Sequence, residues 1–332
     1  MKNIIEGQQE RSGLEGAVFQ LIYYLKSQKY DFIAVSPMTH LCWLNKYKEK
    51  IGNDLRDIFG WGFSFNKDIL ESSLFTLLHA EKLIYPVGDL WKSEIRVSTL
   101  GNELFIHSAF PTINPDSVFF GPDTYRFINT VNGHLLESTS FIRRAVEVCC
   151  GASPAAITIA KQCPTARVQA IDINPKALAY SAANARAAGA QIETISNDLF
   201  NNFQLYFDLI VANPPFMMDA KKRAYRDGGG MFGAELALRI VTESLERLAV
   251  GGTFLLYTGA AIVAGEDIFY KHANVILSPL THIEWCYHEI DPDIFSDELL
   301  LTGYEQVERI AAVVLKVHQK SAKPDMRSPF IT

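Results

Sequence analysis

Four short segments of the sequence combine carboxylate, amide, small and proline residues in patterns that could bind a nucleoside. They are Glu147-Val-Cys-Cys-Gly-Ala-Ser, Asp172-Ile-Asn-Pro, Ser196-Asn-Asp-Leu-Phe and Asn213-Pro-Pro-Phe. Each of them ends or directly follows a short run of apolar or β-branched residues. Their side chains can accept hydrogen bonds from hydroxyl and amino groups. Together the segments therefore predict a polar binding site.

The most specific segment is Asn213-Pro214-Pro215-Phe216, which follows the apolar run 207–212. Both prolines lack an N–H group and have a restricted φ, so the strand must stop there with its last carbonyls pointing outward. From average proline usage, such a string arises by chance about once in a hundred chains of this length. A rigid corner at the end of a strand is predicted.

The segment at Glu147 predicts a tight turn that a ligand can approach. Cys149, Cys150, Gly151 and Ala152 are small, which lets the backbone turn sharply. Ser153 is expected to cap the following helix, with Pro154 in its first turn. Any α/β protein needs such a turn, so the segment is informative only together with the others.

Asp172 and Asp198 are candidates for binding a nucleoside. Asp172 follows a predicted strand, where an acidic residue can bind both ribose hydroxyls. A nicotinamide dehydrogenase also uses such an acid, but its phosphates require several glycines, and this turn has only Gly151, with Ser153 where a later glycine is expected. A nucleoside without phosphates fits better. Asp198 could accept from an adenine amine while Leu199 covers the ring.

From about residue 141 the sequence alternates strand and helix patterns, which predicts an α/β fold. Strands are expected at 144–148, 168–173, 192–195, 207–212 and 252–257, and helices at 155–161, 175–188 and 235–248. This alternation predicts a parallel sheet with helices on both faces, whose ligands bind beyond the carboxyl ends of the strands. Two more strands, at 281–288 and 310–317, are joined by a long acidic loop.

Residues 1–110 are expected to form a mainly helical N-terminal domain with a substrate-recognition or packing role. Apolar residues at steps of three and four predict helices at 16–26 and 67–83. Gly101-Asn102 predicts a hairpin between strands 95–100 and 103–107, a combination similar to a winged helix. The helices lack the Lys/Arg stripe of a nucleic-acid footprint. Prolines at 111–115 indicate a linker, followed by a second domain at 117–320 and a tail at 321–332.

Composition and charge narrow the class of protein. The chain has 332 residues, 48% of them hydrophobic and 20% charged, with a formal charge of −6. These values exclude a disordered chain and make adhesion to nucleic acid by bulk charge improbable. A local basic cluster in the segment 217–233 could meet RNA phosphates or an acidic protein surface, or it could form a solvated loop. Its basic residues are Lys221, Lys222, Arg223 and Arg226, and Gly228, Gly229 and Gly230 are expected to supply flexibility.

Five cysteines without a CxxC pair predict neither disulfides nor a metal site. The N-terminus has no signal-peptide pattern, and no apolar run approaches about 18 residues. A cytoplasmic location without membrane attachment is expected, whereas the oligomeric state cannot be predicted.

The four segments, in this order, resemble the class I S-adenosylmethionine (SAM)-dependent methyltransferases that modify planar amide or amine nitrogens. The likeness is strongest to release-factor glutamine N5-methyltransferases and the related small-domain RNA methyltransferases, and it extends over residues 117–318. Phe120-Gly-Pro-Asp-Thr124 is similar to an Arg-Pro-(Asp/Glu)-Thr segment of the glutamine enzymes, with Gly121 in place of the arginine. The resemblance implies a Rossmann-like fold, SAM as cofactor and no metal.

The resemblance also assigns roles to residues. Asn213 Oδ1 and the Pro214 carbonyl would accept the two hydrogens of the target NH₂, and Phe216 would stack on its plane. Two acceptors can stabilise the positive charge that grows on the nitrogen. Alignment with the methyl group then suffices, and no histidine base is required. The catalytic set is Asn213, Pro214, Pro215 and Phe216, and the cofactor set is Glu147, Cys149, Gly151, Asp172, Ile173, Asp198, Leu199 and Asn213.

Within the cofactor set, Asp172 would bind the ribose, and Gly151 would pass beneath the methionine portion. Asp198 and Leu199 would bind the adenine. Glu147 would face the methionine amino group through water. The methyl acceptor is expected to be a macromolecule. It is either a release-factor-like protein with a target glutamine, or a nucleic acid (RNA or DNA) with a base amine. The alternative is a non-catalytic nucleoside- or RNA-binding protein with the same fold.

Overall fold

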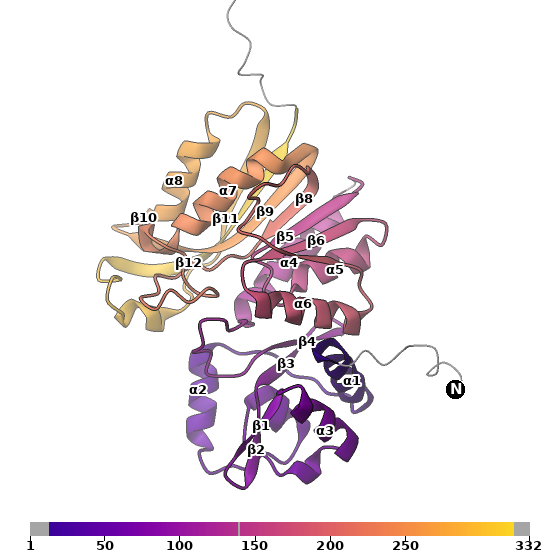
Figure 1. The fold of residues 1–332 in the computed structure, drawn as a ribbon. Helices are drawn as coiled ribbons and strands as arrows, with labels where there is room; N and C mark the ends of the chain where they lie inside the picture. The colour runs from indigo at the N-terminus through magenta and orange to yellow at the C-terminus, as the bar shows by residue number, and fades with distance from the viewer. Residues whose placement is uncertain (1–12, 139, 322–332) are drawn as a thin grey trace, which may run out of the picture.

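A computed structural model describes residues 13–138 and 140–321 of the chain (Figure 1). Its main sheet has the order β11-β12-β9-β8-β5-β6-β7, with β10 paired to β9 outside this path. The strands are β5 (Arg144–Val148), β6 (Arg167–Asp172), β7 (Glu193–Ser196), β8 (Phe207–Ala212), β9 (Leu248–Val263), β10 (Glu266–Asp267), β11 (Ile283–Asp291) and β12 (Val307–Gln319). All but the first residue of the predicted tail lies outside the described residues.

The sheet begins in its middle and grows in both directions. From β5 the chain moves outward to β6 and β7, then returns to β8 and β9 on the other side of β5, and these five strands are parallel. This reversal places a crevice at the carboxyl ends of β5 and β8, where open α/β sheets bind ligands. The expected parallel sheet does not extend to β12, which runs antiparallel between β9 and β11. A loop without a crossover helix joins β11 to β12, and this connection favours an antiparallel pair.

Helices cover both faces of the sheet, as the sequence predicted. Side chains of α4 (Pro122–Glu137) and α5 (Pro154–Gln162) share one apolar cluster with the sheet. On the other face, α7 (Glu235–Arg247) and α8 (Ile268–Leu277) contribute to a second cluster. The sequence pattern did not identify α4 or α8. No helix within the described ranges has the length and apolarity to cross a membrane.

Residues 13–108, the described part of the N-terminal region, form three α-helices and two hairpins. They are α1 (Leu14–Ser27), α2 (Pro37–Lys46), α3 (Ser72–Ala80), the pair β1 (Ile84–Val87) and β2 (Leu90–Ser93), and the pair β3 (Ile95–Leu100) and β4 (Glu103–Ser108). The predicted helix at 67–83 is wrong in its first part. A 3₁₀ turn at Lys67–Ile69 is followed by extended backbone at Leu70 and Glu71, which lets the Leu70 side chain reach the core, where it is 4% exposed.

The hairpin predicted around Gly101-Asn102 is β3–β4, in which Leu100 pairs with Glu103. Most of its residues are buried, including neighbours that point to opposite faces. Little of this hairpin is therefore exposed in the way that a nucleic-acid-binding wing would be.

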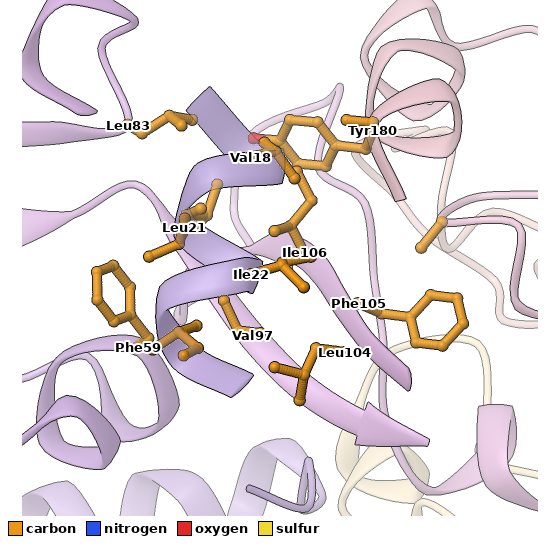
Figure 2. Packing of buried hydrophobic residues seen from close by; sticks show 14 of the residues in the cluster. Val18, Leu21, Ile22, Phe59, Leu83, Val97, Leu104, Phe105, Ile106 and Tyr180 are labelled. Carbon is orange, nitrogen blue, oxygen red and sulfur yellow. The ribbon is translucent and has the colours of Figure 1, made fainter. Parts of the chain in front are cut away.

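One apolar cluster joins these N-terminal elements to α6 (Pro175–Ala188). Figure 2 shows Val18 and Ile22 of α1 beside Ile106 of β4, with Tyr180 of α6 close by. A polar contact adds to this packing, because the buried Asn184 side chain accepts from Ile106 N (2.8 Å) and donates to Ile106 O (3.1 Å). The N-terminal elements are thus packed directly on a helix of the sheet.

Candidate active site

A cavity of about 320 Å³ opens at the carboxyl ends of the central strands. Every residue that the sequence placed in the catalytic or cofactor set lines it: Glu147, Cys149, Gly151, Asp172, Ile173, Asp198, Leu199, Asn213, Pro214, Pro215 and Phe216. These residues are contributed by four parallel strands or the loops after them, and they meet because parallel strands end at the same edge of a sheet.

The turn after β5 is built from left-handed backbone. Cys149 and Gly151 have φ values of +55° and +54°, a conformation that costs free energy for a residue with a side chain. A Cβ atom added at Gly151 would have only Val118 Cγ1 near it, at 4.0 Å, so this turn leaves open space above its backbone. Burial raises the pKa of the Cys149 thiol, which is therefore neutral.

The expected cap of α5 is replaced by a carboxylate. Ser153 makes no capping hydrogen bond, and its hydroxyl donates to Ser181 Oγ (2.7 Å). Instead, Glu147 accepts from the backbone N–H groups of Ala155 (3.3 Å) and Ala156 (2.7 Å). Burial raises the pKa of Glu147 to about 8, although these two hydrogen bonds oppose the shift. The prediction that Ser153 caps α5 is wrong.

Asp172 ends β6 and is held by backbone donors. Its Oδ2 accepts from Gly151 N and its Oδ1 from Asn174 N, both at 2.9 Å. Burial raises its pKa, and the backbone hydrogen bonds act in the opposite direction. The next residue, Ile173, lines the cavity and is 57% exposed. A fixed carboxylate beside an open apolar side chain suits a ribose and the ring attached to it.

Asp198 has a partner that the sequence did not reveal. Arg239 of α7 donates to Asp198 Oδ1 and Oδ2, both at 3.0 Å. Leu199 is buried and has a φ of +49°. This ion pair fixes the Asp198 carboxylate at the cavity wall and engages both of its oxygens.

The corner after β8 presents a free amide. No hydrogen bond to the Asn213 side chain is found within residues 13–138 and 140–321, although Asn213 lines the cavity. Pro214 is buried. The Phe216 ring lies against β9, where a Cβ at Gly259 would come within 2.3 Å of Phe216 Cδ2. Phe295 packs on the same ring with centroids 6.0 Å apart.

The segment after the corner folds back onto it. Gly228 N donates to Met217 O (2.7 Å). A Cβ at Gly228 would lie 2.1 Å from Gly233 O and 2.8 Å from Phe216 Cα. The sequence predicted that Gly228 supplies flexibility, but these close contacts give a different reason for glycine there.

The basic cluster in this segment is mostly paired inside the protein. Its ion pairs are Arg223 with Asp219 (2.6 Å), Lys222 with Asp227 (3.1 Å) and Arg226 with Glu298. Within the described part of the chain, Lys221 is the cluster member without such a pair. Arg223 and Tyr225 also donate to the Thr112 carbonyl, so the segment closes over the cavity beside the predicted linker.

Sequence reasoning missed one functional candidate in the Gly-Pro-Asp-Thr segment. Asp123, in the first turn of α4, lines the cavity and is 3% exposed. It accepts from Tyr257 of β9 (2.5 Å). The resemblance drew attention to this segment, and the signal that could have identified Asp123 was an acidic residue within it, upstream of the cofactor strand.

The strand order, the crevice at the β5–β8 reversal and the acids on β5, at the end of β6 and after β7 are those of a class I SAM-dependent methyltransferase. The methyltransferase small domain family matches residues 132–261. The release factor glutamine methyltransferase of Chlamydia trachomatis serovar D is 30% identical over 229 residues, which span 60% of this chain and 74% of that protein. The ribosomal RNA small subunit methyltransferase C of Shewanella loihica is 31% identical over 232 residues, 68% of this chain and 60% of that protein.

Among solved structures, the M. jannaschii tRNA m1G37 methyltransferase aligns with a TM-score of 0.46 and 14% identity, over 69% of this chain and 58% of that chain. This structural similarity is too low to support the assignment to a family. On the sequence relationships, the chain belongs to the methyltransferase small domain family. It is a SAM-dependent N-methyltransferase.

Proposed function

We propose that this enzyme methylates the side-chain amide of a glutamine in a protein, with a release factor as the acceptor. The observation that carries the proposal is the Asn213–Pro214 corner, whose side-chain amide lines the cavity without a partner in the described residues. Asn213 Oδ1 and the Pro214 carbonyl would accept the two hydrogens of the target NH₂, and the Phe216 ring would lie against its plane.

This arrangement addresses the weakness of an amide as a nucleophile. Its lone pair is delocalised, and acceptors placed at its N–H groups stabilise the charge that grows as the new bond forms. SAM supplies an electrophilic methyl group on a sulfonium. The chain therefore needs to orient the nitrogen and exclude water, and the residues at the corner are fixed by Gly228, Gly233 and Gly259.

The cofactor roles belong to the same proposal. Asp172 would bind the ribose hydroxyls above the open turn at Gly151, and Ile173, Asp198 and Leu199 would surround the adenine. The neutral Cys149 would add apolar contact, and Glu147 would stay near the amino-acid end. These assignments are supported by the shared cavity and by the fixed orientation of each carboxylate.

Two observations favour protein over RNA as the acceptor. The Chlamydia relative, which is matched over most of its length, is named for a release factor glutamine. The basic residues nearest the corner are engaged with Asp219, Asp227 and Glu298, which leaves few cations for phosphates. The N-terminal elements would serve acceptor recognition, and a cytoplasmic location remains part of this proposal.

The test is labelled methyl transfer from SAM to purified release factor, with ribosomal RNA, tRNA and DNA as parallel acceptors. We expect label in the release factor, and mass spectrometry should locate it on a glutamine. Label in RNA would favour the function of the Shewanella relative, and SAM binding without label in any pool would favour the non-catalytic alternative.

Asn213→Ala tests the corner directly. We expect the rate of transfer to fall about 10²-fold or more, by analogy with the loss of one group that stabilises transition-state charge. The affinity for S-adenosylhomocysteine should stay within a few fold. Asn201→Ala, at an exposed position, is the control and should leave both values unchanged. An equal loss of transfer and affinity in Asn213→Ala would assign Asn213 to the cofactor site instead.

A further inference from the structure

The cavity wall holds four carboxylates, and three of them already accept hydrogen bonds on both oxygens. Glu147 is engaged by the start of α5, Asp172 by Gly151 and Asn174, and Asp198 by Arg239. The fourth is Asp123. A ligand that brings a strong cationic N–H donor therefore finds the least committed acceptor at Asp123.

The two oxygens of Asp123 differ in their surroundings. Oδ1 accepts from Tyr257 Oη (2.5 Å) and from Arg126 NH1 (3.4 Å). No other residue in the described ranges donates to Oδ2, although Asp123 lines the cavity and its side chain is 5% exposed. Because Asp123 lines the cavity, a bound ligand can donate to Oδ2 without displacing a donor from another residue.

The charged side chains around Asp123 also favour the binding of a cation. Arg126 donates to Asp291 as well (2.8 Å), so two carboxylates share one guanidinium group. Burial raises the pKa of Asp123 despite this guanidinium. With both acids ionised, the three side chains carry a formal charge of −1, which an ammonium group would balance.

The position of Asp123 indicates which end of the cofactor it meets. Across the sheet, Asp172 ends β6, Glu147 lies on β5, and the Asn213 corner follows β8. Tyr257, which donates a hydrogen bond to Asp123, is on β9. It directly follows Leu256, the residue that pairs with Ala212 at the end of β8. Asp123 therefore lies on the Asn213 side of the cavity, away from the acid expected at the ribose.

We propose that Asp123 Oδ2 binds the α-ammonium group of the methionine portion of SAM. This assignment gives Asp123 a direct contact with the amino group that the resemblance had placed opposite Glu147 through water, and the oxygens of Glu147 face the start of α5. It depends on the cofactor and not on the identity of the methyl acceptor.

The test compares two nucleosides by calorimetry: S-adenosylhomocysteine, which has the ammonium group, and 5′-methylthioadenosine, which lacks the amino-acid portion. For Asp123→Asn we expect at least a tenfold loss of affinity for S-adenosylhomocysteine, as for other hydrogen bonds to charged groups. The affinity for 5′-methylthioadenosine should stay within twofold, which also shows that the variant has folded with its cavity intact. Asp68→Asn, at an exposed position outside the cavity lining, should change neither affinity by more than about twofold.

An S-adenosylhomocysteine analogue without the α-amino group gives a measurement on the unaltered enzyme. We expect it to bind at least tenfold more weakly than S-adenosylhomocysteine. Equal affinities for these two ligands would overturn the proposal, as would equal losses for both nucleosides in Asp123→Asn. Unchanged affinity for S-adenosylhomocysteine combined with a raised KM for the acceptor would assign Asp123 to the acceptor and would also overturn it.

Discussion

Glu147 shows how one buried carboxylate can contribute to stability in a pH-dependent way. Its folded-state pKa is raised to about 8 from an ordinary value of 4.5. The folded protein therefore binds a proton that the unfolded chain has already lost in this interval. Because the folded pKa is the higher one, the contribution of Glu147 is fully present below about pH 4.5 and is lost as the pH rises towards about 8.

Glu147→Gln should remove this dependence, because the amide is neutral at every pH in the interval. We expect the free energy of unfolding of the wild type to fall relative to the variant by at most about 1.4 kcal/mol per pH unit between about pH 5 and about pH 8. Glutamine has one acceptor oxygen for the N–H groups of Ala155 and Ala156, which adds a cost that does not vary with pH. Urea unfolding at several pH values measures both effects, and parallel curves for the two proteins would contradict the assignment.

Residue types and strand ends predicted a set of residues, from Glu147 to Phe216, that all line one cavity, but they missed Asp123. They could not predict what each carboxylate binds, because the partners come from elsewhere in the chain or from backbone geometry. Arg239, the partner of Asp198, lies 41 residues away. Ser153 fails as a cap because its backbone is left-handed, a property that its residue type does not indicate.

Whole elements were predicted correctly where the apolar residues have a strong periodicity. They were missed or misplaced where tertiary packing determines the local structure. The β5–β9 region follows its alternating pattern. Helix α2 has His40 as its single buried residue, so it has no apolar stripe to detect. The predicted helix at 67–83 breaks at Leu70, whose burial is a tertiary effect that a helical period cannot report.

The close approach of β9 to the Asn213 corner predicts a mutational effect on catalysis. In Gly259→Ala the new Cβ would lie 2.3 Å from Phe216 Cδ2, and Phe295 packs on that ring. The ring must move, so we expect the rate of methyl transfer to fall about tenfold or more while S-adenosylhomocysteine affinity is retained, because misplacing the acceptor impairs orientation. Steady-state kinetics and calorimetry measure the two.

The matched control is Gly133→Ala, in the interior of α4 with no atom within 4 Å of the new Cβ. Alanine is the better helix former by about 1 kcal/mol, so this variant should keep full activity and gain stability. Equal rates for the wild type and Gly259→Ala would show that the Phe216 position does not limit transfer.

At the scale of the whole molecule, the N-terminal elements and the cofactor turn share one framework. The apolar cluster of α1, β3 and β4 continues into α6 and includes Ala152 of the cavity wall. Asn184 connects the same parts, since its side chain contacts Ile106 and also donates to Ala152 O (3.2 Å). Such continuity favours cooperative unfolding of both regions, although the sequence suggested two domains.

We therefore expect a single calorimetric transition for the full chain and an increase in its midpoint with S-adenosylhomocysteine. At a concentration of 100 times the Kd, the ligand adds about 2.7 kcal/mol. Hydrogen exchange should then slow at Ile106 of β4 as well as at the cavity. Asn184→Ala should lower the free energy of unfolding by about 2–4 kcal/mol, because it leaves buried backbone groups without partners, whereas Asn201→Ala should not. Two separate transitions, with ligand protection confined to the residues after 140, would instead mean that the shared cluster does not couple the two regions.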